Sequence, residues 1–201
     1  MFSAHFLAAL QTALGRIDHA AIEAMAHDLA AVRARGGRLF ILGVGGGAGH
    51  AGHAVNDFRK ICGFEAYAPT DNVSELTARI NDEGWEGCYA AWLDGSRLRA
   101  EDGLLVFSVG GGSAEPPVSM NIVRALDRAR AVGATITGVV GRSGGYTAEV
   151  ADSCCVVPTV DPALVTPLVE GMQAVVWHLL VAHPALARQA GKWEQLAAAA
   201  Q

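Results

Sequence analysis

The chain has 201 residues and a formal net charge of −5, and hydrophobic residues make up 51% of it against 17% charged residues. This composition excludes a disordered chain, which has low hydrophobicity and high charge. No run of Lys or Arg occurs, which argues against nucleic acid as the main partner, because binding to its backbone depends on clustered cations. The length predicts a single domain over residues 1–201.

The N-terminus predicts an amphipathic helix and not an export signal. Its apolar residues, from Phe2 to Leu14, recur at helical spacing, and no basic segment or small-residue cleavage site accompanies them. No apolar stretch reaches the roughly 20 residues that a membrane span needs. We therefore expect a cytoplasmic protein that binds neither membrane nor nucleic acid. The cysteines show no metal-type spacing, which favours buried, reduced thiols at Cys62, Cys88, Cys154 and Cys155.

Hydrophobic runs and turn residues predict an alternation of helices and strands. The first half of the chain predicts two helices over 2–35 that break near 15–18, a strand at 37–43, a helix after the next glycine-rich turn, a weak strand at 64–68, and helices at 70–80 and 85–93. The second half predicts strands at 103–110, 134–141 and 154–159. A helix at 118–132 and a short helix at 146–150 separate these strands, and a long helix from Pro167 to Leu180 follows them. Pro184 then precedes a polar, Ala-rich tail. The predicted fold class is α/β, a three-layer αβα sandwich around five parallel strands.

Two glycine-rich loops, Gly43–Gly49 and Gly110–Ser113, follow the first and third predicted strands. Ligands of open parallel sheets bind beyond the carboxyl ends of the strands. Both loops lead towards helices whose free N–H groups favour an anion, and Ser108 and Ser113 add hydroxyl groups. Neither loop carries the Lys-Ser/Thr pair of a nucleoside-triphosphate site. The loops therefore predict a site for a phosphate monoester.

The first loop also matches the dinucleotide-binding pattern G-x-G-x-x-A, and Asp71 lies near the distance expected of a ribose-binding acid. Against that alternative, the following helix carries His50, His53, Asn56 and Asp57 where such a helix packs apolar residues on the sheet. A dinucleotide would also leave the second glycine loop without a role. The phosphate-monoester interpretation is therefore preferred.

Two predicted helices carry ionisable residues among apolar ones. His53 and Asp57 are four residues apart and share one helix face, whereas Glu170 and His178 lie in the apolar segment LVEGMQAVVWHLLV, where both are costly without partners. Each residue alone is better explained by a structural role, but the four together favour a shared site. Positions 170 and 178 are about 12 Å apart on an ideal helix. One ion can take both only if Gly171 marks a bend or helix start, or if several subunits contribute.

These motifs together resemble the SIS (sugar isomerase) domain family, and within it the phosphoheptose isomerases. GVGGGAGHAGHAVND is similar to the family's G-N-G-G-S loop followed by H-x-x-x-E, and residues 108–113 are similar to its S-T-S-G-N-S loop. The pair Asn81-Asp82 matches an Asn-Asp pair after the second strand, and Glu170 and His178 stand where the final helix has Gln and, eight residues later, His. The resemblance covers nearly the whole chain.

The resemblance implies an aldose–ketose isomerase that converts sedoheptulose 7-phosphate to a glycero-manno-heptose 7-phosphate through an enediol, with Zn²⁺ as the metal. Asp57 stands on the family's catalytic Glu and His178 on its catalytic His. The family's zinc set falls on His53, Asp57, Glu170 and His178. Its substrate and phosphate positions fall on Gly45, Gly46, Gly47, Asn81, Asp82, Ser108, Gly110, Gly111 and Ser113. The resemblance also implies a homotetramer with sites between subunits, in which residues 1–35 pack the oligomer, 36–182 form the core and 183–201 form a tail.

The chain departs from this family pattern at several positions. Asp57 is one methylene shorter than Glu, and a misplacement of about 1 Å can cost about 100-fold in rate. Glu170 adds negative charge in place of Gln, and Gly47, Val109 and Gly110 replace hydroxyl residues. A short insertion, Glu115-Pro116-Pro117, follows the second loop. Two alternatives stay open: an isomerase of another sugar phosphate, or a non-catalytic module that binds a sugar phosphate or a replication initiator protein.

Overall fold

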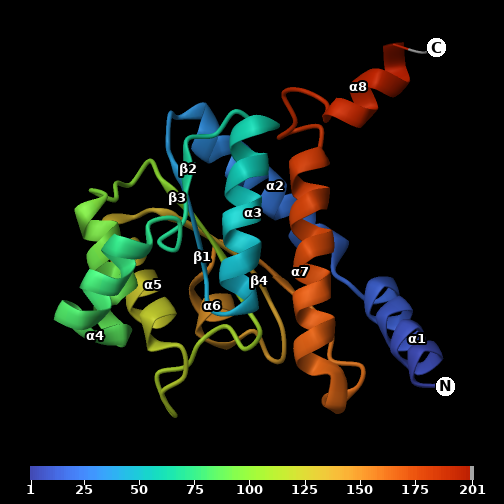
Figure 1. The fold of residues 1–201 in the computed structure, drawn as a ribbon, viewed down its shortest axis with the longest axis horizontal. Helices are drawn as coiled ribbons and strands as arrows, with labels where there is room; N and C mark the ends of the chain where they lie inside the picture. The colour runs from blue at the N-terminus through green and yellow to red at the C-terminus, as the bar shows by residue number, and fades with distance from the viewer. Residues whose placement is uncertain (200–201) are drawn as a thin grey trace.

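The computed structural model describes residues 1–199, and within them one five-stranded, all-parallel sheet forms the centre of the molecule (Figure 1). Its strands are β1 (Leu39–Gly43), β2 (Ala66–Tyr67), β3 (Gly103–Ser108), β4 (Thr135–Val140) and β5 (Ser153–Val156). The strand order is β2-β1-β3-β4-β5. The chain leaves β1 towards one edge and returns to β3 on the other side, so the topological switch point lies between β1 and β3. The predicted α/β fold class is confirmed.

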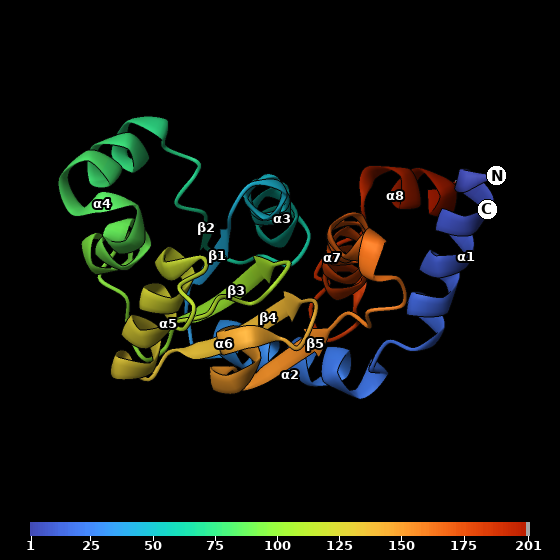
Figure 2. The ribbon, with the colours of Figure 1, turned by 90° about the horizontal axis from the view of Figure 1, so that it is seen from below.

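Helices cover both faces of this sheet. They are α1 (Phe2–Gly15), α2 (His19–Ala34), α3 (Gly46–Lys60), α4 (Val73–Gly95), α5 (Met120–Val132), α6 (Gly145–Val150), α7 (Val165–Ala182) and α8 (Lys192–Ala199), with a 3₁₀ turn at Pro162–Leu164. Successive strand residues point to opposite faces. Leu39 and Ile41 therefore pack with α2, α3 and α7, whereas Phe40 and Leu42 pack with α4 and α5. Figure 2 shows α4 and α5 on one side of the molecule and α7 on the other.

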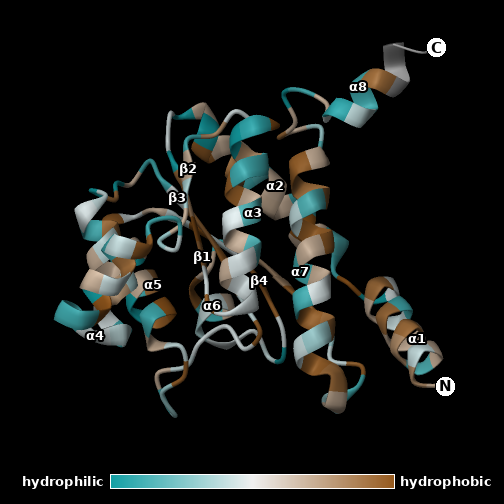
Figure 3. Cartoon of the chain, viewed as in Figure 1, coloured by the Kyte–Doolittle hydropathy of each residue, from teal (hydrophilic) through white to brown (hydrophobic). Residues whose placement is uncertain are grey.

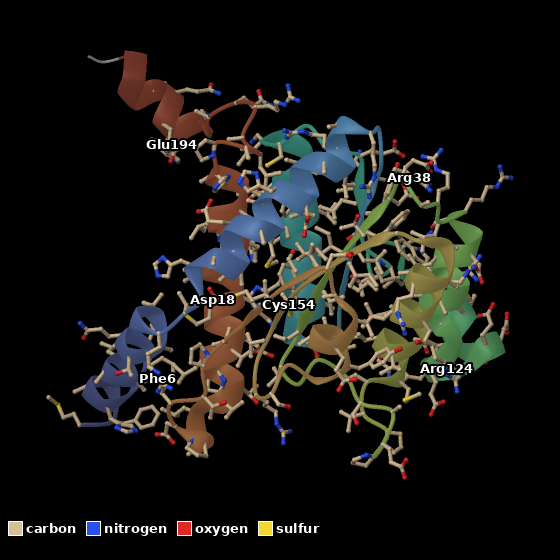
Figure 4. All side chains as sticks on the ribbon, turned by 180° about the vertical axis from the view of Figure 1, so that it is seen from behind. Phe6, Asp18, Arg38, Arg124, Cys154 and Glu194 are labelled. Atoms are coloured by element: carbon tan, nitrogen blue, oxygen red, sulfur yellow. The ribbon has the colours of Figure 1, made fainter. Side chains whose placement is uncertain are left out.

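The N-terminal helices differ in how they pack. Asp18 caps α2 by accepting hydrogen bonds from the backbone N–H groups of Ala20 and Ala21, which explains the predicted break between the two helices (Figure 4). The α2 helix buries a stripe of apolar residues, Ile22, Met25, Ala26, Leu29 and Val32. By contrast, α1 lies beside α7 at the edge of the molecule and leaves Phe2 and Leu7 exposed (Figures 1 and 3).

The helices predicted at 70–80 and 85–93 correspond to the two parts of α4, which are separated by a kink at Gly84 with non-helical angles of φ 76° and ψ 162°. The final helix begins at Val165 and not at Pro167. Pro167 fits inside the first turn because its missing N–H has no helical partner there.

The final helix also corrects the expectation about apolar length. By length and composition alone, Pro162–Ala182 is long and apolar enough to cross a membrane. Half of this stretch is buried in the domain, as in the core helix of a globular fold, and Trp177 within it is buried. The sequence expectation failed because Glu170 and His178 interrupt the run without lowering its average hydropathy enough.

The predicted polar tail is partly ordered against the core. Arg33 of α2 donates hydrogen bonds to the carbonyl oxygens of Ala185 and Leu186, and Leu186 is fully buried. The α8 helix follows, with Glu194 close to the end of α7 in Figure 4. Residues 200–201 of the predicted tail lie outside the described residues.

Candidate functional site

Three loops meet at the carboxyl ends of neighbouring strands, at the lower end of the sheet in Figure 1. They follow β1, β3 and β4, and the first two of these strands flank the switch point, where α/β sheets bind ligands. The loop after β1 packs closely against the end of β3, because a Cβ at Gly47 would lie 2.6 Å from the carbonyl oxygen of Phe107. Tyr89 of α4 donates a 2.7 Å hydrogen bond to the carbonyl oxygen of Gly43 and fixes the end of β1.

Two histidines and an aspartate converge where α3 and α7 cross. One ligand atom from each of His53, Asp57 and His178 lies within 4.8 Å of the other two. His53 and Asp57 are one turn apart on α3, with 3.8 Å between His53 Nε2 and Asp57 Oδ2. The His53 and His178 rings lie 5.5 Å apart, centre to centre, and meet edge to face. The structure therefore brings together three of the four predicted metal ligands within one chain.

Hydrogen bonds orient two of these side chains. His178 Nδ1 lies 2.7 Å from the carbonyl oxygen of Ala174. Since a carbonyl oxygen only accepts, Nδ1 carries the proton and Nε2 keeps its lone pair for a ligand or for proton transfer. Asn56 donates to Asp57 Oδ1 at 2.8 Å, which leaves Oδ2 directed to His53. Two imidazole nitrogens and one carboxylate oxygen at this separation fit a divalent ion such as Zn²⁺ with a coordination position left open.

Glu170 occupies a different place from the other three residues. Helix α7 runs unbroken through Gly171, so Glu170 lies two turns before His178. Its carboxylate atoms lie 2.6–2.7 Å from where a Cβ at Gly46 would stand, over the N-terminus of α3. The helix neither bends nor starts at Gly171, so Glu170 does not reach the His53–Asp57–His178 cluster within its own chain. Its carboxylate instead lies beside the first glycine loop.

The hydroxyl groups of the second glycine loop form hydrogen bonds with the backbone of the same loop and of the insertion after it. Ser108 Oγ accepts a 3.0 Å hydrogen bond from the N–H of Gly111, which leaves the Ser108 proton free to donate. Ser113 Oγ donates to the carbonyl oxygen of Glu115. The insertion forms a small turn that is closed by paired backbone hydrogen bonds between Ser113 and Val118.

The predicted residues Asn81 and Asp82 lie on α4 and are exposed. Their side chains bond to each other, Asn81 Nδ2 to Asp82 Oδ1 at 2.9 Å. Figures 1 and 2 both place α4 on the opposite side of the molecule from α7. Within one chain, these two residues therefore do not join the His53–Asp57–His178 cluster.

A cavity of about 570 Å³ adjoins the cluster, and sequence reasoning missed most of its lining. Asp57 and His178 form part of its wall, and Arg188 and Glu194 of the C-terminal segment close it from the other side. The backbone N–H of Arg188 bonds to the carbonyl oxygen of Ile61 at 2.9 Å, which fixes this segment to the end of α3. No local sequence pattern predicts that the C-terminal segment forms a wall of this cavity.

Trp177 is a further residue of the site that was not predicted. Its buried ring stacks on the His178 ring at 3.4 Å between ring centres, and it meets the His53 ring at 4.7 Å. The packing fixes both imidazoles against the core. The signal was present in the sequence, because Trp177 directly precedes His178 in an otherwise aliphatic run.

The parallel sheet, its glycine-rich loops and the paired histidines define an α/β protein of the sugar isomerase (SIS) class. No protein-family model matches the chain. The phosphoheptose isomerase of Rhodospirillum rubrum is 33% identical over 172 residues, which span 83% of this chain and 85% of that protein. The chain belongs to the phosphoheptose isomerase family.

Other relatives and solved structures agree with this assignment. The phosphoheptose isomerase of Mycobacterium tuberculosis is 37% identical over 134 residues, 63% of either chain. The lincomycin biosynthesis protein LmbN of Streptomyces lincolnensis is 32% identical over 159 residues, 74% of this chain and 56% of that protein. The structure of phosphoheptose isomerase from Neisseria gonorrhoeae has a TM-score of 0.75 at 24% identity and covers 90% of this chain and 95% of that one. The enzyme from Francisella tularensis gives a TM-score of 0.76 at 21% identity, with 90% and 94% covered. At such identities these likenesses concern the fold.

Proposed function

We propose that the protein interconverts sedoheptulose 7-phosphate and a glycero-manno-heptose 7-phosphate as an aldose–ketose isomerase. Membership of the phosphoheptose isomerase family supports the reaction class and the substrate class. The observation that carries the proposal is the meeting of His53, Asp57 and His178 beside a 570 Å³ cavity. A purely structural role does not explain His53, because its side chain is 59% exposed apart from the contact of its ring with Trp177.

Asp57 and His178 provide the acid and base that the isomerisation needs. Asp57 takes a proton from C1 of the ketose while the Nε2 side of a protonated His178 gives a proton to the C2 oxygen, which forms the 1,2-enediol. Return of the carbon-bound proton to C2 and loss of the O1 proton to His178 give the aldose. Trp177 holds the imidazole in place, and the glycine loops orient the phosphate end of the substrate.

We also propose a bound metal ion and the residues that hold it. His53, Asp57 and His178 would hold a divalent ion, with Zn²⁺ favoured by the two imidazoles and one carboxylate; Nε2 of His178 serves either this ion or the proton transfer, not both at once. Such an ion polarises the substrate carbonyl when bound. Glu170 completes the set of four only from another subunit, because within its own chain it lies against Gly46. Substrate contacts are proposed at Gly45, Gly46, Gly47, Asn81, Asp82, Ser108, Gly110, Gly111 and Ser113.

We also propose a homotetramer in the cytoplasm, with active sites between subunits. Exposure of Asn81, Asp82 and His53 in the single chain supports shared sites, since a neighbouring subunit can then bring α4 to an α7. The single domain would use residues 1–35 for subunit packing and 36–182 as its core. Free thiols at all four cysteines support a reducing compartment, and Cys154 is only partly buried while the other three are buried.

The test combines turnover with metal content. The wild-type protein should convert sedoheptulose 7-phosphate to the aldose and contain about one Zn²⁺ per chain, as expected of a site with three protein ligands. Asp57→Asn removes the base and His178→Ala removes the acid, so each should lower kcat by at least about 100-fold. His19→Ala, at the exposed start of α2, is the control that keeps both activity and metal.

Two results would contradict the proposal. If either variant kept near-wild-type kcat, the acid and base roles would be wrong. If the wild-type protein isomerised another ketose phosphate and ignored sedoheptulose 7-phosphate, the alternative substrate would be correct. The replacement of Gln by Glu170 and its place against Gly46 favour including such substrates in the assay.

A further inference from the structure

The loop after β4 packs backbone to backbone against the second glycine loop. Thr147 donates to the carbonyl oxygen of Gly111 from its N–H at 2.9 Å and from its hydroxyl at 2.7 Å. A Cβ at Gly111 would lie 1.8 Å from the carbonyl oxygen of Gly144, and one at Gly145 would lie 2.2 Å from that of Gly110. The two loops therefore form one rigid surface.

Arg142 extends from this third loop across the second one. Its Cδ lies 3.8 Å from where a Cβ at Gly110 would stand, so the side chain lies beside that glycine. Arg142 lines a cavity of about 560 Å³ together with Gly110, Gly112 and Ser113. It has a φ of +55°, in the left-handed region that side chains rarely adopt.

The charge on Arg142 is not neutralised by another side chain. Among residues 1–199, no carboxylate lies within 4.0 Å of its guanidinium group. The other charged side chains that line the same cavity are Glu115 and Glu149, so without Arg142 this cavity would be acidic and would repel an anion. A guanidinium group matches a phosphate with two parallel hydrogen bonds.

The second loop is poor in the groups that would otherwise hold a phosphate. Val109 and Gly110 offer no hydroxyl, and the proton of Ser113 goes to the carbonyl oxygen of Glu115. The remaining donors within this loop are its backbone N–H groups and Ser108, all of them neutral. A cation from outside the loop would therefore strengthen the binding of a doubly charged phosphate at this position.

We propose that Arg142 binds the phosphate group of the substrate over the second glycine loop and sets the preference for phosphorylated over unphosphorylated sugars. The identity of the sugar rests on the proposed function, whereas the anion site rests on the loop geometry and its charges. Arg142 is thus a specificity-determining residue contributed by the β4 loop, apart from the His53–Asp57–His178 cluster.

Inorganic phosphate is the probe, because its binding tests the Arg142 site independently of isomerase activity. Binding of phosphate to the wild-type protein, measured by isothermal titration calorimetry at low ionic strength, should weaken roughly 10- to 100-fold in Arg142→Met, as expected for loss of a charged hydrogen-bonding partner. Arg142→Lys keeps the charge without the paired geometry and should fall between the two. Glu149→Gln removes a repulsive charge and should bind phosphate as well as the wild type or more tightly.

Arg97→Met is the matched control, because Arg97 is also exposed and has a left-handed φ of 54°, but it precedes β3 at the opposite end of the sheet. It should bind phosphate like the wild type. In the isomerase assay, Arg142→Met should raise KM at least about tenfold while kcat stays within about threefold and metal content is unchanged. A thermal melt without phosphate confirms that the variant is folded.

The two proposals fail in distinguishable ways. If Arg142→Met binds phosphate within twofold of the wild type, or if the wild type binds no phosphate, the Arg142 site is wrong whatever the enzyme does. If phosphate binding falls as expected but sedoheptulose 7-phosphate is not turned over, the anion site stands and the proposed substrate is wrong.

Discussion

Asp102 illustrates how one buried side chain orders the amino ends of the strands. It is fully buried and accepts hydrogen bonds from the N–H and guanidinium of Arg38 and from the N–H of Arg99. Burial alone raises the pKa of a carboxyl group, but the hydrogen bonds and charge of Arg38 outweigh it, so the pKa of Asp102 lies below its ordinary value. Figure 4 places Arg38 at one end of the molecule, far from the labelled Phe6.

Replacing Asp102 with Asn should lower the free energy of unfolding by about 3–5 kcal/mol, because it leaves a partly buried guanidinium without its anion. Urea unfolding at neutral pH measures this loss. Asp94→Asn is the control, since its pair with Arg128 is exposed and such pairs contribute at most about 1 kcal/mol.

The pair of Arg38 and Asp102 makes the loss of unfolding free energy in Asp102→Asn depend on pH. A carboxyl group whose pKa is lowered on folding stabilises the fold above its unfolded pKa, about 3.9, and the contribution is lost as the pH falls through the folded value. The difference between wild type and Asp102→Asn should therefore be constant near neutral pH and shrink below about pH 4. A difference that grew on acidification would contradict the assigned pKa direction.

At the scale of residues, the sequence indicated the three residues of the His53–Asp57–His178 cluster because the signal was local. His53 and Asp57 share a helix face by their spacing alone, and His178 was conspicuous in an apolar helix. The contact between Glu170 and Gly46 was not predictable, since it joins residues that are distant in sequence and depends on where α7 crosses α3. Arg142 escaped notice for the same reason, because only the contact between two loops gives it a role.

At the scale of elements, strands and helices were predictable wherever periodicity was strong, and their ends were not. The predicted strand at 154–159 is only Ser153–Val156, because Pro158 has no N–H to continue the ladder. The edge strand β2 is reduced to Ala66–Tyr67. The order of the strands, β2-β1-β3-β4-β5, comes from the structure, since no local pattern encodes which strands become neighbours.

The contact between the two glycine loops predicts a contrast between two glycines. Gly111→Ala should lower the free energy of unfolding by about 3 kcal/mol or more, because its Cβ would overlap the carbonyl oxygen of Gly144 and its φ is +76°. Gly171→Ala, inside α7 with nothing within 4 Å of the new Cβ, should raise it by roughly 0.5–1 kcal/mol.

Chemical denaturation of both variants measures this contrast, with circular dichroism to confirm the native helix content. Equal destabilisation by the two substitutions would mean that the loops do not approach each other closely. A destabilising Gly171→Ala would instead indicate that the surface of α7 at this position is covered in the assembled protein.

At the scale of the whole molecule, the chain exposes more surface than its size requires. Its accessible surface is 9679 Å², whereas a compact monomer of this mass exposes about 9,000 Å². The excess fits the position of α1 at the edge of the molecule, where Leu7 is 60% exposed and Phe2 is 72% exposed. On α7, Val175 and Leu179 are also exposed beside the ligand cluster. Large apolar surfaces of this kind mark interfaces between chains.

The proposed tetramer therefore predicts that a charge on α1 dissociates it. Leu7→Asp should shift the mass measured by light scattering at micromolar concentration from the tetramer towards smaller species, because a desolvated carboxylate has no partner in an apolar interface. Ala131→Asp is the control, because Ala131 is exposed near the end of α5, outside residues 1–35 and outside the α4 and α7 helices that the proposed interface uses. Since the proposed sites lie between subunits, isomerase activity should fall together with the mass of Leu7→Asp. A wild-type monomer would refute the tetramer, and full activity in a dissociated variant would show that one chain suffices for catalysis.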